Sequence, residues 1–174
     1  MIRSLAIAAL LLIGMAASAG ARTPNHADEW NGAEINWRDA RSGIYEASQT
    51  GRPVLMVFHA TWCSVCKRFR AVFKDPGVVA ASRDFVMILV DADKEKEING
   101  AFQPDGSYVP RTLFIDSNGN VSDKLVGSDP QYPHSVDVDT PAELLSLMKK
   151  AHKVFDMAPP APVASPDVAG ESRT

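Results

Sequence analysis

Two continuous apolar runs, residues 53–58 and 85–90, dominate the hydrophobic pattern of this chain. Both are rich in strand-forming residues and have little polar alternation, which is typical of strands that helices cover on both faces. Between them, residues 63–74 place apolar side chains at helical spacing, and residues 75–77 break this pattern before a short helical piece that continues through Ser82. The order strand, helix, strand predicts a βαβ unit with two parallel strands.

Amphipathic segments on either side of this unit predict further helices. The first has Asn36 as its predicted cap and ends at Gly51. Its apolar face consists of Trp37, Ala40, Ile44 and Ala47. The last begins at residues 140–143, a Thr-Pro-Ala-Glu sequence that predicts a capping box with proline in the first turn. Its apolar stripe consists of Leu144, Leu147, Met148, Ala151 and Phe155.

Two connecting segments complete the predicted order of elements. Residues 91–105 are strongly charged, which favours an exposed, solvated connection over a metal site. Residues 112–116 and 121–126 are strand-like and flank a turn that contains Asn118 and Gly119. Because an Asn-Gly pair readily adopts the positive φ angles of a tight turn, this pattern predicts a β-hairpin.

The first 21 residues have the features of an export signal. Arg3 provides a positive charge, residues 5–17 are almost wholly apolar, and small residues follow, which predicts cleavage after Ala19 or Ala21. An uncleaved membrane anchor is the alternative, but the apolar run is shorter than the ~20 residues that a spanning helix needs. We therefore expect a periplasmic or secreted protein that is not inserted in a membrane after cleavage.

The remaining chain has a length of about 150 residues, which is typical of one domain with its own core. Residues 22–34 are polar and predict an irregular N-terminal segment, residues 35–156 form the predicted domain, and the Ala- and Pro-rich residues 157–174 predict a disordered tail. The net charge of −3 is small and its signs are interspersed, so nothing indicates a nucleic acid as partner.

Cys63 and Cys66 are the only two cysteines of the chain, and they stand at a predicted strand-to-helix junction. At the start of a helix, unpaired N–H groups and the helix dipole favour the thiolate form of the first cysteine. A disulfide ring this small adds little stability. The pair therefore indicates reversible thiol-disulfide exchange rather than a structural scaffold.

Metal and haem sites also use a Cys-x-x-Cys pair. Structural zinc needs four ligands. The chain's histidines are not at the spacing of zinc ligands, and they are His26, His59, His134 and His152. Covalent haem attachment needs a histidine directly after the second cysteine, where Lys67 stands. Binding of Cu(I) by Cys63, Cys66 and a histidine stays open as an alternative, whereas disulfide exchange needs no bound cofactor.

The run from Trp62 to Lys67, the order of elements, and Pro110 at the start of the predicted hairpin resemble the thioredoxin-fold family over about residues 36–155. Residues 108–116 are more narrowly similar to the anterior-gradient and small endoplasmic-reticulum thioredoxin-like proteins, which are related to protein disulfide isomerases. The resemblance implies an α/β fold with a central mixed sheet flanked by helices. It also implies a cis bond before Pro110, opposite the cysteine pair.

The resemblance implies roles for individual residues as well. Cys63 would be the nucleophile and Cys66 the resolving cysteine of a protein-thiol:disulfide oxidoreductase. Trp62, Val109 and Pro110 would contact the substrate, with a purely structural, corner-filling role as the alternative for Trp62. The implied partners are protein thiols and disulfides, together with a redox protein that resets the pair. A chaperone-like, client-binding module is a further alternative.

One position departs from the family pattern. Thioredoxins and disulfide isomerases commonly bury an acid six residues before the first cysteine, and this chain has Val57 there. We expect proton transfer at Cys66 to be slower or to pass through another group, with His59 and Lys67 as candidates. His59 equally fits a purely structural role. The two residues between the cysteines do not specify the direction of electron flow.

Overall fold

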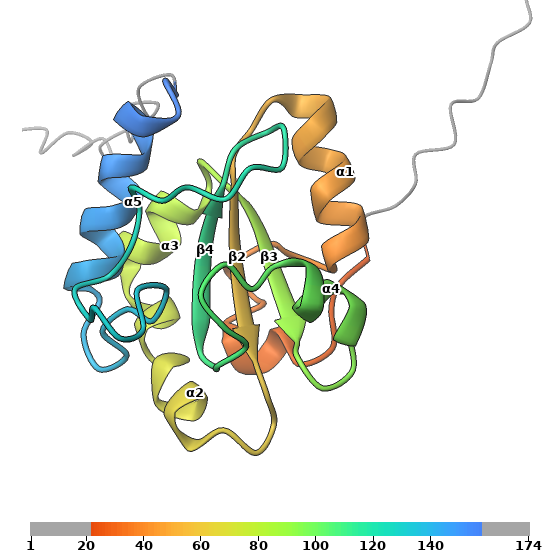
Figure 1. Cartoon of the computed structure of the whole chain (residues 1–174), viewed down its shortest axis with the longest axis vertical. Coiled ribbons are helices and arrows are strands. Elements are labelled where there is room, and N and C mark those ends of the chain that lie inside the picture. The colour runs from red at the N-terminus through yellow and green to blue at the C-terminus, as the bar shows by residue number, and fades with distance from the viewer. Residues whose placement is uncertain (1–21, 158–174) are drawn as a thin grey trace, which may run out of the picture.

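A four-stranded mixed sheet forms the centre of the computed structural model, which describes residues 22–157 (Figure 1). The strands are β1 (Trp37–Arg38), β2 (Val54–His59), β3 (Val86–Asp91) and β4 (Arg111–Ile115), in the spatial order β1-β3-β2-β4. Within the described residues, no helix combines the length and the apolar character needed to cross a bilayer. The predicted export signal and all but the first residue of the predicted tail lie outside the described residues.

Strand β2 lies between its two partners. It pairs in parallel with β3 and antiparallel with β4. All 6 residues of β2 and all 6 of β3 are buried, because helices cover both faces of these strands. The predicted βαβ unit and the predicted mixed sheet are therefore confirmed.

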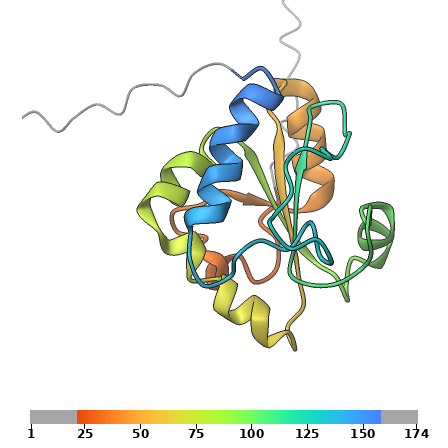
Figure 2. The same ribbon diagram turned by 60° about the vertical axis from the view of Figure 1, so that its left-hand side comes forward.

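Helices form a layer on each face of the sheet (Figure 2). They are α1 (Ala40–Thr50), α2 (Ser64–Phe69), α3 (Pro76–Ser82), α4 (Lys96–Ala101) and α5 (Ala142–Val154). Helices α1 and α4 pack on the face to which Met56 and Phe58 of β2 point. Helices α2, α3 and α5 pack on the other face, together with Leu55 and Val57. The chain thus has two apolar cores, and the cysteine helix α2 belongs to the second.

Asp75 caps helix α3, where the sequence predicted a break. Its Oδ1 accepts hydrogen bonds from the backbone N–H groups of Gly77 at 2.8 Å and Val78 at 3.1 Å, and Pro76 fills the first helical position. These bonds satisfy donors that have no partner within the helix.

Asp75→Ala should lower the free energy of unfolding by about 1 kcal/mol, because it removes this cap. Asp75→Asn keeps an acceptor at the same place and should retain most of that stability. Chemical denaturation of the two variants beside the parent protein checks this expectation. An equal loss in both variants would show that the acceptor oxygen at this position is not the source of the stability.

The first long helix begins later than predicted. Helix α1 starts at Ala40, and its cap is Asp39, whose Oδ1 accepts from the N–H of Ser42 at 2.9 Å. Asn36 is not the cap, because Trp37 lies in β1 and pairs with Met87 of β3. The pairing with a neighbouring strand outweighs the local helical pattern at these positions.

The sequence predicted an irregular N-terminal segment over residues 22–34, but part of this segment is helical. Residues Ala27–Trp30 form a 3₁₀ helix, and Trp30 is 0% exposed. The rings that lie against Trp30 are those of Trp37, His59, Phe69 and Phe73. Part of the core therefore comes from residues that precede the predicted domain boundary.

The predicted hairpin forms only in part. Asp116 accepts hydrogen bonds in the turn, and Gly119 has a φ angle of 91°, but Asn118 does not have a positive φ. After the turn a single bridge joins Ile115 to Val121, and residues 121–126 form no strand. The chain leaves the sheet at this point, so β4 is the last strand on its side.

The predicted capping box of the last helix is also absent. Helix α5 has no side-chain cap, and Thr140 donates its hydroxyl hydrogen to Asp137. The Glu143 carboxylate instead accepts hydrogen bonds from the backbone N–H groups of Ser128 and Asp137, each with a nitrogen–oxygen distance of 2.6 Å. Glu143 therefore ties the long connection between β4 and α5 to the start of the helix.

The charged connection 91–105 is more ordered than an exposed loop. It contains helix α4, and its first residue, Asp91, is only 4% exposed. The Oδ1 atom of Asp91 accepts from the N–H groups of Asp93 and Lys94. These bonds turn the chain sharply after β3.

Candidate active site

Cys63 and Cys66 form a disulfide at the start of α2, directly beyond the carboxyl end of β2. Their Cα atoms lie 5.3 Å apart. Cys63 is the cap residue of the helix, and the backbone N–H of Cys66 points to its sulfur at 3.0 Å. Cys63 retains 4% exposure, whereas Cys66 is 0% exposed. An N–H donor directed at sulfur favours the thiolate of Cys63, which is also the less buried of the two.

The segment before β4 lies against this disulfide. The Val109–Pro110 peptide bond is cis, and Pro110 is buried. The carbonyl oxygen of Val109 lies 3.7 Å from the sulfur of Cys63. The structure thus brings the pair Cys63 and Cys66 together with Val109 and Pro110, which come more than forty positions later in the printed sequence.

Trp62 lies on the surface beside the cysteines. It is 68% exposed, and its indole Nε1 donates to Oδ2 of Asp93 at 2.8 Å. A side chain this exposed does not fill a corner of the core. Contact of Trp62 with a substrate stays a prediction, and the hydrogen bond to Asp93 gives the ring a defined place.

The two candidates for proton transfer and the position of the missing acid have different surroundings. Val57 is fully buried in the middle of β2, so this strand position supplies no carboxylate. Lys67 is exposed on α2. His59 is 0% exposed, and neither of its ring nitrogens has a hydrogen-bond partner within the described residues. Burial, the largest effect, lowers the pKa of His59 to about 4 although Asp91 opposes the shift, so His59 is neutral at pH 7.

The buried His59 should make the stability of the protein depend on pH. An unfolded histidine has a pKa near 6.5, so between pH 6.5 and 4 the unfolded chain binds a proton that the native state does not. Each pH unit in this window corresponds to about 1.4 kcal/mol. The free energy of unfolding should therefore fall by about 3 kcal/mol as the pH drops from 6.5 to 4, and this contribution should be constant above pH 6.5.

His59→Phe removes this titration and should flatten the curve in that window. Urea denaturation of both proteins at several pH values from 7 to 4 measures the difference between the two curves. Taking the difference cancels the contribution of the carboxyl groups that do not interact with His59. Parallel curves would show that His59 titrates normally in the native state.

No group of three or more His, Cys, Asp or Glu side chains within residues 22–157 is arranged to hold a metal ion. The disulfide itself contains both sulfurs that a Cu(I) site would use. Copper binding by the reduced pair is therefore tested by titrating the reduced protein with Cu(I).

Sequence patterns did not single out Arg111, although it lies directly after Pro110 and is 0% exposed. The only sign in the sequence is a charge at the start of a strand whose next residues are Thr112, Leu113 and Phe114. A charged residue there would ordinarily predict the exposed edge of a strand.

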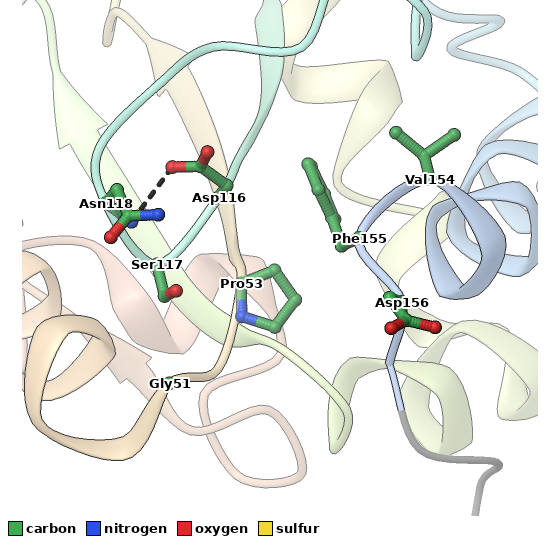
Figure 3. Close-up of a pocket in the computed structure, with 8 residues that line it drawn as sticks. All are labelled: Gly51, Pro53, Asp116, Ser117, Asn118, Val154, Phe155 and Asp156. Atoms are coloured by element: carbon green, nitrogen blue, oxygen red, sulfur yellow. Dashed lines mark hydrogen bonds between the residues drawn. The ribbon is translucent and has the colours of Figure 1, made fainter.

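Figure 3 shows a separate pocket, which lies at the end of the sheet where β2 begins. Its volume is about 290 Å³, and it is lined by Gly51, Pro53, Asp116, Ser117, Asn118, Val154, Phe155 and Asp156. Gly51 and Pro53 precede β2, whereas the cysteines follow it. The pocket contains no cysteine and does not belong to the candidate site.

Comparison with known proteins identifies relatives of the same kind. Residues 36–117 match a family described as thioredoxin-like. Anterior gradient protein 3 of Xenopus tropicalis is 28% identical over 137 residues, which cover 75% of this chain and 80% of that protein. The thiol:disulfide interchange protein DsbD of Ralstonia nicotianae is 36% identical over 80 residues, which cover 44% of this chain and 13% of DsbD.

Solved structures show the same fold. A thioredoxin from Thermus thermophilus superimposes with a TM-score of 0.53 at 21% identity, covering 68% of this chain and 87% of that one. A disulphide isomerase from Xylella fastidiosa gives a TM-score of 0.51 at 18% identity, covering 77% and 98%. With the cysteine pair at the start of α2 and the buried Pro110 opposite it, these matches agree with the implied fold. The chain therefore has the thioredoxin fold, and its residues 36–117 form a thioredoxin-like domain.

Proposed function

We propose that this protein is a thiol:disulfide oxidoreductase that exchanges disulfides with protein cysteines through Cys63 and Cys66. The observation that carries the proposal is the disulfide at the start of α2, with the less buried sulfur directed to the carbonyl of Val109. The kinship with anterior gradient proteins and with part of a thiol:disulfide interchange protein supports it.

The reaction runs through a mixed disulfide. In the reducing direction, the Cys63 thiolate attacks a substrate disulfide, forms a bond to one sulfur, and releases the other as a thiolate. The Cys66 thiolate then attacks the sulfur of Cys63, which releases the second substrate thiolate and leaves the Cys63–Cys66 disulfide. The substrate gains two electrons and the cysteine pair loses two. The reverse order of steps oxidises a substrate dithiol, and a separate redox protein restores the starting state.

Three residues would bind the substrate. Val109 would pair through its backbone with an extended substrate chain, Pro110 would hold this segment against the sulfurs, and Trp62 would cover one side of the pair. The export signal expected in the first 21 residues supports a periplasmic or secreted location, where disulfides persist. The partners would then be exported proteins with cysteines, without membrane insertion of this chain after cleavage and without a nucleic acid.

The reduction potential of the Cys63/Cys66 pair tests this proposal. The mature protein is equilibrated in glutathione buffers of graded ratio, and the fraction with an intramolecular disulfide is measured by alkylation and mass. A potential of about −180 mV would indicate oxidation or reshuffling of substrates, and one of about −270 mV would indicate a reductase. If the pair forms no disulfide at any ratio, the proposal is wrong, and anaerobic titration with Cu(I) becomes the next measurement.

A further inference from the structure

Arg111 is a buried cation to which the proposed reaction assigns no role. It is the first residue of β4 and is 0% exposed. Among residues 22–157, none of the ion pairs includes its guanidinium. Taking a charge out of water is costly unless other contacts replace the lost hydration. The contacts of Arg111 therefore indicate what its charge does in the fold.

The guanidinium joins three parts of the chain. Its Nη1 donates to the carbonyl oxygen of Tyr108 at 2.8 Å, and its Nη2 donates to Oδ1 of Asn99 in α4 at 2.7 Å. Its face lies over the ring of Phe58, 4.1 Å from the ring centroid. The two planar donors and the aromatic face are contacts that arginine makes and lysine does not reproduce.

These contacts lead directly to the reactive sulfur. Tyr108 is followed by Val109, whose carbonyl lies 3.7 Å from the sulfur of Cys63. Phe58 pairs with Arg111 across β2 and β4, and it lies five residues before Cys63 in the printed sequence. Strand β4 begins at the end of the sheet from which β2 leads to α2 (Figure 1). Arg111 thus connects the backbone before Pro110 with the strand that leads to the cysteines.

We propose that Arg111 is a positioning residue, which fixes the backbone of residues 108–110 for main-chain contact with a polypeptide substrate. This inference rests on the proposed function. A polypeptide that pairs with Val109 needs that backbone in one place, because its own disulfide must reach Cys63 at the same time. A small disulfide needs only access to the sulfur. Loss of the Arg111 contacts should therefore impair exchange with proteins far more than exchange with small molecules.

The test compares two substrates in the full mature protein. Arg111→Met keeps an unbranched apolar stem over Phe58 but loses both hydrogen bonds. We expect kcat/KM for a protein disulfide such as insulin to fall about tenfold, mainly through KM. We expect the rate with a small aromatic disulfide to stay within about twofold of the parent. Arg111→Lys keeps the charge without the planar pair of donors, so it should share the defect.

Two further variants separate positioning from a general loss of structure. Asn99→Ala leaves Arg111 in place and removes one acceptor, and it should weaken the protein reaction by about threefold in the same selective way. Arg52→Met is the matched control. Arg52 also donates to two main-chain carbonyls, those of Arg83 and Phe85, but it precedes β2 at the far end of the sheet. It should change neither reaction.

Equal losses with both substrates in Arg111→Met would overturn the inference, and so would an unchanged rate with insulin. Full activity of Arg111→Lys would overturn it too, because charge alone would then suffice. A parent protein that forms its disulfide in glutathione buffers but shows no selectivity among these variants refutes only this inference. A parent protein that forms no disulfide refutes the proposed function itself.

Discussion

Cys66→Ser should trap a covalent complex with a protein substrate, whereas Cys63→Ser should trap none, and both should reduce catalysed disulfide turnover to the background rate. Cys63 is the less buried cysteine, and its sulfur accepts the N–H of Cys66, so we expect it to make the first attack. Without the Cys66 sulfur, nothing within the protein resolves the mixed disulfide.

The measurement is simple because the chain has only two cysteines. In the Cys66→Ser variant, any complex that is seen on a non-reducing gel and released by a reductant must be joined through Cys63. The variant with both cysteines replaced by serine is the control and should form no complex. Trapping by Cys63→Ser and none by Cys66→Ser would reverse the roles of the two sulfurs. Client binding that survives the double replacement would favour a chaperone-like module.

Trp30→Ala should lower the free energy of unfolding by about 3 to 5 kcal/mol, which is the range for removing a large aromatic side chain from a core. Trp30 is fully buried, and the guanidinium of Arg70 lies 5.7 Å from the centroid of its ring. Its carbonyl also accepts the indole N–H of Trp37 at 2.7 Å. A cavity here would remove contacts from both the N-terminal segment and the helices beyond the cysteines.

Trp62→Ala is the matched control, because it deletes the same side chain from a position that is 68% exposed. It should change stability by no more than about 0.5 kcal/mol. Denaturation followed by far-ultraviolet circular dichroism measures both variants without relying on tryptophan fluorescence. If Trp30→Ala costs no more than Trp62→Ala, the N-terminal segment contributes little to the folded domain.

The parts of the fold that depend on residues close together in the sequence could be predicted well. The two apolar runs became β2 and β3, because a strand covered on both faces needs apolar residues at every position. The cysteine pair lies at the start of a helix as predicted. The break at residues 75–77 proved to be the cap of α3. In each case the physical cause lies within a few residues of the effect.

Other local sequence patterns were just as clear but predicted the wrong structure. In these cases a group that is distant in the sequence contacts the residue in place of its local partner. Glu143 could have completed a capping box with Thr140, but the N–H groups of Ser128 and Asp137 take its carboxylate instead. Trp37 fits a helical face, but pairing with β3 places it in a strand. Nothing near Trp30 in the sequence indicates the rings of Phe69 and Phe73 that bury it.

The sequence by itself determined the thioredoxin-like order of elements and the chemistry of the site, because these depend on periodic apolar positions and on the spacing of Cys63 and Cys66. Only the tertiary structure decided what surrounds that chemistry. It buried His59 without hydrogen-bond partners among the described residues, and it placed the carbonyl of Val109 beside the sulfur of Cys63. It also enclosed Arg111 between α4 and β2. Burial and long-range contact depend on how distant segments pack together, and no local pattern of residues contains that information.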